Sequence, residues 1–206
     1  MDCLKQIIDE VKAKAREGFV PIVRDNTLKA LLELTRNLKP KNILEIGTAT
    51  GYSALNMLSN CEAHLLTIEK NAERVAEARL NFEKSKQLDR ITLIEGDAID
   101  VLSDLVQSSQ KFDLIFLDGP KGQYIKYLPF LKQLLNEGGV IFADNVGLLG
   151  LVANQEKVNH KNRTMVRNMQ SFLNEIQTDS DFNSNIYDID DGYAVIQKIQ
   201  KNDRNN

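Results

Sequence analysis

The chain has 206 residues, of which 42% are hydrophobic and 27% are charged, as in an ordinary globular protein. We expect residues 1–206 to form a single domain, because this length suffices for one sizeable core. A formal net charge of −3 excludes a globally basic nucleic-acid-binding protein, so any such binding needs a local basic patch.

Two helices are predicted near the N-terminus. Apolar residues recur there at helical spacing, at Leu4, Ile7, Ile8, Val11 and Ala15. This pattern predicts an amphipathic helix within residues 1–17, whose apolar stripe packs on the core, covers a ligand or meets a second subunit. A loop over 18–23 follows, and a second helix is expected over about 26–38, before Pro40.

Strands and helices alternate in the middle of the chain. The predicted strands are 42–46, 65–69, 91–95, 112–117 and 139–143. The predicted helices between them are about 53–59, 71–86, 99–107 and 124–135. Nearly continuous apolar strands separated by helices predict an α/β fold with a parallel sheet that is covered on both faces.

The pattern changes after residue 145. A polar stretch over 154–163 precedes a predicted helix over about 164–177. Two apolar runs, 185–189 and 193–196, are joined through Asp191-Gly192, which is a strong hairpin signal. The sheet should therefore have seven strands and finish with an antiparallel strand, followed by a polar, frayed tail over 201–206.

The cysteines and the apolar runs indicate a cytoplasmic protein. Cys3 and Cys61 form neither a metal-spaced pair nor a disulfide framework, which is typical of free thiols in a reducing compartment. No apolar run reaches the roughly 18 residues that a membrane span needs. Charged residues interrupt the N-terminal segment, where a signal peptide would have its apolar core.

A glycine-rich turn follows the first predicted strand, in the sequence NILEIGTATGYS (42–53). Its G-x-x-x-G spacing, at Gly47 and Gly51, differs from the G-x-G-x-x-G of dinucleotide-binding proteins. Glu45 lies just before this turn, where a carboxylate would repel a pyrophosphate but hold a cationic ligand. S-Adenosylmethionine carries a sulfonium and an ammonium and therefore fits, whereas an ordinary tight turn is the alternative.

Polar residues also follow the other four middle strands. They are Glu69, then Gly96-Asp97-Ala98, then Asp118-Gly119-Pro120-Lys121, and finally Asp144-Asn145. Ligands of open α/β sheets bind at this carboxyl edge. Glu69 lies 22 positions after Gly47, near the offset at which an acidic residue binds ribose hydroxyls, and Asp97 is placed to hold an adenine ring. The alternative is that Glu69 and Asp97 cap the helices that follow them.

Two carboxylates and one amide at this edge predict a divalent-cation site. Asp118, Asp144 and Asn145 come from strands expected to be neighbours, and their hard oxygen donors suit Mg²⁺ or Ca²⁺ rather than zinc. Turn-forming residues are the alternative. Lys121 follows Asp118 by three residues, and a lysine beside a bound cation can act as a general base. A solvated surface lysine is the alternative there.

Five stretches of the chain resemble the cation-dependent class I O-methyltransferases, the family of the catechol and caffeoyl-CoA O-methyltransferases. The stretches are LEIGTATGYSAL (44–55), TIEKN (67–71), EGDA (95–98), FDLIFLDGPKGQY (112–124) and GGVIFADNV (138–146). The resemblance covers most of residues 20–196. It implies a Rossmann-like methyltransferase fold, S-adenosylmethionine and Mg²⁺ or another divalent cation as cofactors, and a homodimer.

The resemblance also implies roles for individual residues. Asp118, Asp144 and Asn145 are the expected metal ligands. Lys121, the expected base, and Asp118 are the expected catalytic residues. Glu69 is expected to bind the ribose hydroxyls. The full set of expected cofactor contacts is Val23, Glu45, Gly47, Ser53, Glu69, Asp97, Ala98 and Asp118.

Within this family the chain is most similar to the bacterial tRNA 5-hydroxyuridine methyltransferases, which form 5-methoxyuridine at the anticodon wobble position. The signals are the length and the segment HKNRTMVRNM (160–169). A 5-hydroxyuracil carries a hydroxyl beside a carbonyl oxygen and can chelate a metal as a catechol does. Four basic residues within 155–170 accompany the single acid Glu156. We expect tRNA phosphate contacts at Lys161, Arg163 and Arg167, with a solvated surface as the alternative.

Three other functions remain open from the sequence. The first is the same chemistry on a small catechol-like or CoA-linked phenol, against which the lack of tryptophan is weak evidence. The second is a non-catalytic cofactor-binding module, which the joint presence of Lys121 and the three expected metal ligands argues against. The third is a nicotinamide dehydrogenase, which the missing G-x-G-x-x-G disfavours.

Overall fold

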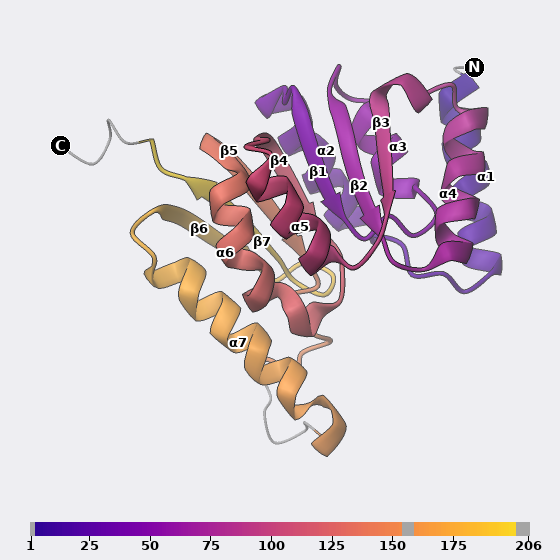
Figure 1. The fold of residues 1–206 in the computed structure, drawn as a ribbon. Helices are drawn as coiled ribbons and strands as arrows, with labels where there is room; N and C mark the ends of the chain where they lie inside the picture. Colours follow the sequence, from indigo (N-terminus) through magenta and orange to yellow (C-terminus); the bar gives the residue numbers. More distant parts are fainter. Residues whose placement is uncertain (1–2, 154–158, 201–206) are drawn as a thin grey trace.

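A mixed sheet of seven strands forms the centre of the molecule (Figure 1). The computed structural model describes residues 3–153 and 159–200. The strands lie in the order β3-β2-β1-β4-β5-β7-β6. Their bounds are β1 Asn42–Ile46, β2 His64–Glu69, β3 Ile91–Glu95, β4 Phe112–Leu117, β5 Leu135–Asp144, β6 Phe182–Tyr187 and β7 Tyr193–Lys198. The first five strands pair in parallel, and β7 is antiparallel to both β5 and β6, which confirms the predicted sheet.

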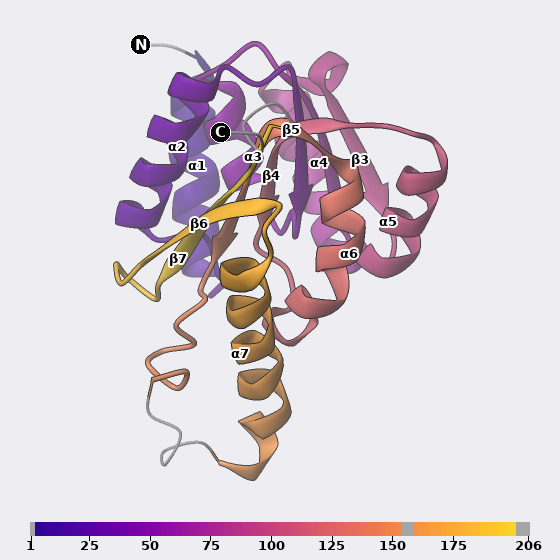
Figure 2. The same ribbon diagram turned by 90° about the vertical axis from the view of Figure 1, so that its left-hand side faces the viewer.

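Helices cover both faces of the sheet (Figures 1 and 2). One face carries α1 Cys3–Glu17, α2 Asp25–Leu38, α3 Tyr52–Leu58 and α4 Ala72–Lys84. The other carries α5 Ala98–Gln107, α6 Tyr124–Leu134 and α7 Arg163–Thr178. The described residues also include short 3₁₀ turns, at η1 Leu88–Arg90, η2 Lys121–Gln123 and η4 His160–Asn162. The predicted helices all exist within a few residues of the expected bounds, whereas the expected frayed tail over 201–206 lies outside the described residues.

Alternation along the central strands divides the apolar core into two layers. In β4, Ile115 and Leu117 pack beneath α5–α7, while Leu114 and Phe116 pack beneath α1–α4. Successive strand residues point to opposite faces, so a strand with helices on both sides must be apolar throughout. This is why the central strands read as continuous apolar runs rather than as alternating ones.

The C-terminal hairpin forms, but its first strand and its turn differ from the expectation. β6 begins at Phe182 and ends at Tyr187, earlier than the predicted 185–189, and the pairing closes at Tyr187 opposite Tyr193. The turn therefore spans the five residues 188–192 rather than Asp191-Gly192 alone. Gly192 still has the positive φ of 75° that favours glycine at such a turn. Only Phe182 is buried in this edge strand, so its periodicity is a weak signal.

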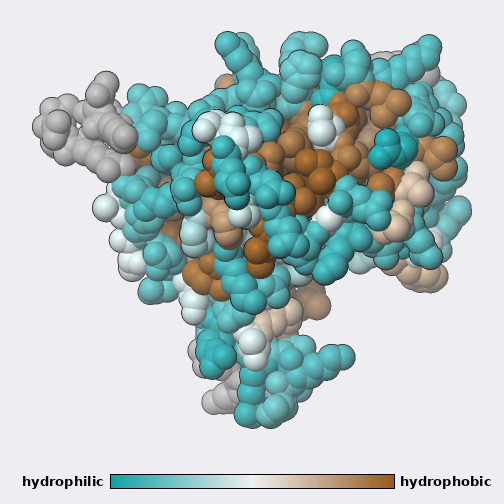
Figure 3. All heavy atoms as spheres, in the orientation of Figure 1, coloured by the Kyte–Doolittle hydropathy of each residue, from teal (hydrophilic) through white to brown (hydrophobic). Residues whose placement is uncertain are grey.

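Part of the apolar surface remains at the protein exterior. Figure 3 shows apolar side chains gathered between α5 and the β3 edge of the sheet. Among the partly buried apolar residues of these two elements are Ile94 in β3 and Val101 in α5. Within residues 3–153 and 159–200, no helix combines the length and the apolar character needed to cross a membrane.

Candidate active site

A cavity of about 620 Å³ opens at the carboxyl edge of the parallel strands. The segments that follow β1 to β5 and the loop before α2 line it. Lining residues relevant to the site are Val20, Arg24, Gly47, Glu69, Lys70, Asp97, Ala98, Asp118, Lys121, Tyr127, Asp144 and Asn145. A smaller neighbouring cavity is lined by Val23, Gly47, Ser53 and Asp118 among others. The structure thus brings all but one of the predicted cofactor and metal residues to the walls of two adjoining cavities.

Gly47 allows the ends of β1 and β4 to approach backbone to backbone. Its φ is +100°, and a Cβ at this position would lie 2.5 Å from the carbonyl oxygen of Asp118. The Asp118 amide donates to the Ile46 carbonyl oxygen at 3.0 Å. A side chain at position 47 would therefore push the glycine-rich turn away from Asp118, which is one of the expected metal ligands.

Glu45 is the predicted cofactor-binding residue that lines neither cavity. Its carboxyl group is fully buried and accepts hydrogen bonds from Ser53 Oγ at 2.5 Å and from Thr67 Oγ1 at 2.6 Å. Burial raises the pKa of Glu45 to about 8, although the two hydroxyl donors oppose this shift. Glu45 therefore orients the Ser53 hydroxyl, which donates a hydrogen bond to it. Its direct contact with the cofactor stays a prediction.

Backbone amides fix the carboxylate of Glu69 at the end of β2. Oε2 accepts from the Ala49 amide at 3.0 Å, and Oε1 accepts from the amides of Lys70 and Asn71, both at 2.9 Å. An ionised carboxylate has about four acceptor positions, so this arrangement leaves capacity for a ligand hydroxyl. The alternative expectation that Glu69 caps the next helix is wrong, because Asn71 is the N-cap of α4.

Asp97 combines the two roles considered for it. Oδ1 accepts from the Ile99 amide at 3.0 Å and so caps α5, while the residue also lines the larger cavity. Oδ2 forms an ion pair with Lys70 Nζ at 2.8 Å. This pair joins the ends of β2 and β3 at the part of the cavity where the adenine ring is expected.

The three expected metal ligands gather at the ends of the neighbouring strands β4 and β5. Asp118 follows β4, Asp144 ends β5, and Asn145 has a left-handed backbone with φ of 56°. Asp144 is only 2% exposed. Burial raises the pKa of Asp144 well above its usual range, and the neighbouring Asp118 carboxylate adds to this effect. Two close carboxylates in a poorly hydrated place are an arrangement that a cation stabilises.

The donor set fits a hard divalent cation. No group of three His, Cys, Asp or Glu side chains gathers as a metal cluster in the described part of the chain. The predicted set therefore consists of two carboxylates and the Asn145 amide oxygen. Carboxylate and amide oxygens suit Mg²⁺, Mn²⁺ or Ca²⁺. The remaining coordination positions would be left to water and to a substrate.

Lys121 and Tyr124 complete this part of the site. Lys121 Nζ lies 2.5 Å from Asp118 Oδ1 and 3.1 Å from the hydroxyl oxygen of Tyr124. The buried Tyr124 hydroxyl in turn shares its proton between two carbonyl oxygens, that of Leu117 at 2.9 Å and that of Asp144 at 3.1 Å. Tyr124 thus joins the ends of β4 and β5, a role that sequence reasoning missed although the residue lies within the FDLIFLDGPKGQY stretch.

The expected tRNA-contacting residues lie next to the site rather than in its wall. Lys161, Arg163 and Arg167 are exposed on η4 and the first turns of α7, which extends beyond the carboxyl edge of the sheet (Figure 1). Asn168 Nδ2 donates to the Gly122 carbonyl oxygen at 2.8 Å, so this helix is fastened to the turn that carries Lys121. Glu156 lies outside the described residues.

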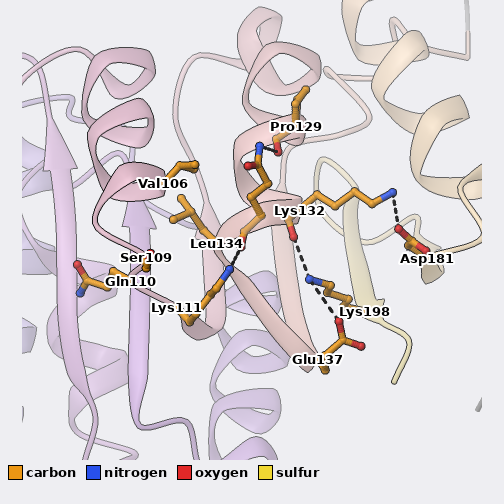
Figure 4. Close-up of a pocket in the computed structure, with 11 residues that line it drawn as sticks. Val106, Ser109, Gln110, Lys111, Pro129, Lys132, Leu134, Glu137, Asp181 and Lys198 are labelled. Atoms are coloured by element: carbon orange, nitrogen blue, oxygen red, sulfur yellow. Dashed lines mark hydrogen bonds and ion pairs between the residues drawn. The ribbon is translucent and has the colours of Figure 1, made fainter. Parts of the chain in front are cut away.

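A separate cavity, of about 580 Å³, lies at the opposite edge of the sheet (Figure 4). Its charged side chains are engaged with the protein itself. Lys132 Nζ lies 2.6 Å from carboxylates of both Asp179 and Asp181, and Lys198 donates to the carbonyl oxygens of Lys132 and Leu135. These contacts hold the starts of β5 and β6 and the end of β7 together, which is a structural role.

The chain matches the family model described as O-methyltransferase over residues 1–199. It is 35% identical over 127 residues to a catechol O-methyltransferase from Niastella koreensis, covering 60% of this chain and 58% of that protein. The chain spans about half the length of the curated relatives it matches.

Two solved structures are similar over nearly the whole chain. A candidate caffeoyl-CoA O-methyltransferase from Staphylococcus aureus is 32% identical, with a TM-score of 0.86 and coverage of 93% and 91% of the two chains. An O-methyltransferase from Bacillus cereus in complex with SAH is 25% identical, with a TM-score of 0.84 and coverage of 94% and 90%. The similarity therefore extends through both halves of the sheet.

Proposed function

The chain belongs to the O-methyltransferase family, and from this premise we propose that it methylates a hydroxyl of a metal-chelating acceptor, with S-adenosylmethionine as the donor. The observation that carries the proposal is the cluster of Asp118, Asp144 and Asn145 beside Lys121, at one end of a cavity whose other end is lined by Glu69 and Asp97. A methyl donor and a chelating acceptor would meet between these two groups.

In this proposal, residues that follow β1 to β3 would hold the cofactor. Glu69, held by three backbone amides, binds the ribose hydroxyls, and Asp97 with Ala98 lies on the adenine side. Gly47 and Ser53 bind the amino-acid end, and Val23 packs against the cofactor from the loop before α2. These groups are fixed before the ligand arrives, which reduces the entropic cost of binding.

Asp118, Asp144 and Asn145 hold a divalent cation in this proposal. When bound, the cation acts as a Lewis acid that lowers the pKa of the acceptor hydroxyl and orients it. Lys121 is the base in this proposal: its Nζ, which lies 2.5 Å from Asp118 Oδ1, would accept the hydroxyl proton after giving up one of its own. The acceptor oxygen then bonds to the sulfonium methyl carbon while the carbon–sulfur bond breaks, leaving S-adenosylhomocysteine and the methyl ether.

The acceptor that we propose is 5-hydroxyuridine at the wobble position of tRNA. Its hydroxyl and adjacent carbonyl oxygen offer the two vicinal donors that the metal site needs, and a loop base can be splayed out of its stack. Lys161, Arg163 and Arg167 support this proposal, because they are exposed on the segment that packs on the Lys121 turn. Such side chains bind phosphates and position the RNA without reading its sequence.

A small catechol-like or CoA-linked phenol is the second candidate acceptor. The observation that favours it is the set of similar proteins, which are named for catechol and caffeoyl-CoA. The chemistry at Lys121 and the metal ligands would be the same. A cytoplasmic location and a homodimer are further parts of the proposal, for which the family resemblance is the support.

The proposal is tested by methyl transfer from labelled S-adenosylmethionine to tRNA bearing 5-hydroxyuridine, with Mg²⁺ and with EDTA. Transfer with Mg²⁺ and its loss with EDTA are expected. tRNA lacking the 5-hydroxyl is the matched control and should take no label. Label on catechol or caffeoyl-CoA at far higher rates, with none on the tRNA, would replace the proposed acceptor by the second candidate.

A further inference from the structure

The start of α2 lacks a capping group of its own. Its N-cap residue is Arg24, whose side chain makes no capping hydrogen bond. The first amides of a helix need acceptors, which a side chain at the N-cap ordinarily supplies. Arg24 is also the end of the segment 20–24, which lines the walls of both cavities, so the placement of this helix start matters to the site.

Asp190 supplies the missing acceptor from the turn between β6 and β7. Its Oδ2 accepts from the Thr27 amide at 2.9 Å and from the Thr27 hydroxyl at 3.0 Å. Its Oδ1 accepts from Asn26 Nδ2 at 3.0 Å. Thr27 is fully buried, and Asp190 has a left-handed backbone with φ of 58°. A residue 163 positions away from Thr27 along the chain thus caps α2.

The same turn also holds the segment that comes after the expected metal ligands. The Val146 amide donates to the Gly192 carbonyl oxygen at 2.9 Å, and the Gly147 amide donates to the Asp191 carbonyl oxygen at 2.8 Å. The Leu149 amide donates to the Asp191 side chain. A Cβ on Gly147 would lie 2.7 Å from the Asp191 carbonyl oxygen, so the two segments are packed backbone to backbone.

We propose that Asp190 is a positioning residue that fixes segment 20–24 relative to Asp144 and Asn145, and so sets the width of the cofactor cavity. The argument is geometric: one five-residue turn bonds the start of α2 on one side and residues 146–149 on the other. The far end of segment 20–24 is fastened independently, by the Val20 amide donating to the Ala15 carbonyl oxygen at 2.8 Å. The Arg24 end of that segment is held by Asp190, and the neighbouring Asp25 also pairs with Lys12 Nζ of α1 at 2.6 Å. Of these two contacts, only the one to Asp190 joins the segment to the turn that holds residues 146–149.

Asp113 provides a matched control at the opposite edge of the sheet. Its carboxylate also accepts three hydrogen bonds, from the amides of Lys41 and Asn42 and from Asn136 Nδ2. It lines neither cavity of the site. Removing either carboxylate leaves three hydrogen-bond donors without their acceptor, but only Asp190 contacts the helix start that follows segment 20–24.

The test compares Asp190→Ala, Asp190→Asn and Asp113→Ala by calorimetric titration with S-adenosylhomocysteine, alongside the melting temperature of each variant. We expect both alanine variants to melt at lower temperature, whereas only Asp190→Ala raises the Kd, by about tenfold, because the cavity wall is no longer preorganised. Asp190→Asn, which keeps an acceptor for the Thr27 amide, should recover part of the affinity.

An unchanged Kd in Asp190→Ala, or an equal rise in Asp113→Ala, would overturn the inference. If Asp190→Ala does not fold, Thr27→Val removes one of the three donors and should raise the Kd by a smaller factor; no rise there would also overturn it. The inference rests on the proposed cofactor. Wild-type protein that does not bind S-adenosylhomocysteine at all would refute that cofactor, a result distinct from equal binding by wild type and variant.

Discussion

Lys121 Nζ and Asp118 Oδ1 lie 2.5 Å apart across one turn of chain, at the end of β4. The pair places a potential proton acceptor beside an expected metal ligand. The Tyr124 hydroxyl, 3.1 Å from the same nitrogen, restricts where the lysine side chain can go. In the proposed mechanism, the group that removes the proton from the acceptor hydroxyl and a group that orients this hydroxyl through the metal would therefore lie side by side in one short segment.

Lys121→Ala should lower turnover by about 100-fold or more, the usual contribution of a general base, and should alter its pH profile. The Kd for S-adenosylhomocysteine should stay within about threefold of wild type, because Lys121 acts on the acceptor rather than the cofactor. Single-turnover methyl transfer and calorimetry measure the two quantities. Lys126→Ala, at an exposed position on α6, is the control. An unaltered pH profile in Lys121→Ala would remove this residue as the base.

Asp144→Ala should abolish metal-dependent turnover while largely sparing cofactor affinity. The side chain is almost completely buried beside Asp118, at the opposite end of the cavity from Glu69, so its loss removes an expected metal ligand and no expected cofactor contact. Transfer assayed over a Mg²⁺ titration checks this, with S-adenosylhomocysteine binding measured in parallel. Asp113→Ala is again the control for the loss of a half-buried carboxylate. Wild-type rates in Asp144→Ala would eliminate the metal assignment.

Much of the site was predictable because it depends on local sequence and on one general rule. The runs NILEI and FDLIFL are strands by their apolar continuity, and parallel strands place the residues after their carboxyl ends at a common edge. That rule alone brings Asp118 and Asp144 together without any knowledge of side-chain packing. Gly47 was likewise visible in sequence, although the reason for it, the approach of the Asp118 carbonyl oxygen, was not.

Contacts between distant segments were not predictable in the same way. The hydrogen bonds from Thr27 to Asp190 join two segments whose polar sequences suggest solvent exposure. No periodicity in the sequence indicates that these two segments are in contact. The direction of the Glu45 carboxyl group was also invisible, because it depends on the hydroxyl of Thr67 on the neighbouring strand. Such long-range hydrogen bonds are set by tertiary packing, whereas sequence patterns report mainly on local structure and on burial.

Arg163→Ala and Arg167→Ala should each weaken tRNA binding and leave cofactor binding intact. If each arginine contacts one phosphate, the slope of log K against log salt should fall by about 0.7 to 1 per residue. Filter binding over a salt series measures this. Arg79→Ala, at an exposed position on α4 away from α7, is the control. Unchanged tRNA affinity in both α7 variants would count heavily against a tRNA acceptor and favour a small phenol.

Glu45→Gln should change how the stability of the protein depends on pH. The pKa of Glu45 is raised from 4.5 to about 8 in the fold, so the native state keeps a proton that the unfolded chain releases. Native stability contributed by this group is therefore full below pH 4.5 and falls as the pH rises towards 8. Glutamine is neutral throughout and can still bond to Ser53 and Thr67, so the variant should lack that fall.

Urea unfolding at pH 5 and pH 8.5 measures the effect as a difference between wild type and variant. From pH 5 to pH 8.5, the free energy of unfolding should fall by at least about 1 kcal/mol more in wild type than in the variant, since one pKa unit is worth about 1.4 kcal/mol. Glu95→Gln, at the exposed end of β3, controls for the loss of one formal charge and should follow the wild-type pH dependence. If Glu45→Gln also runs parallel to wild type, Glu45 is ionised in the native protein, and its buried carboxylate must then be compensated by more than the two hydroxyl groups.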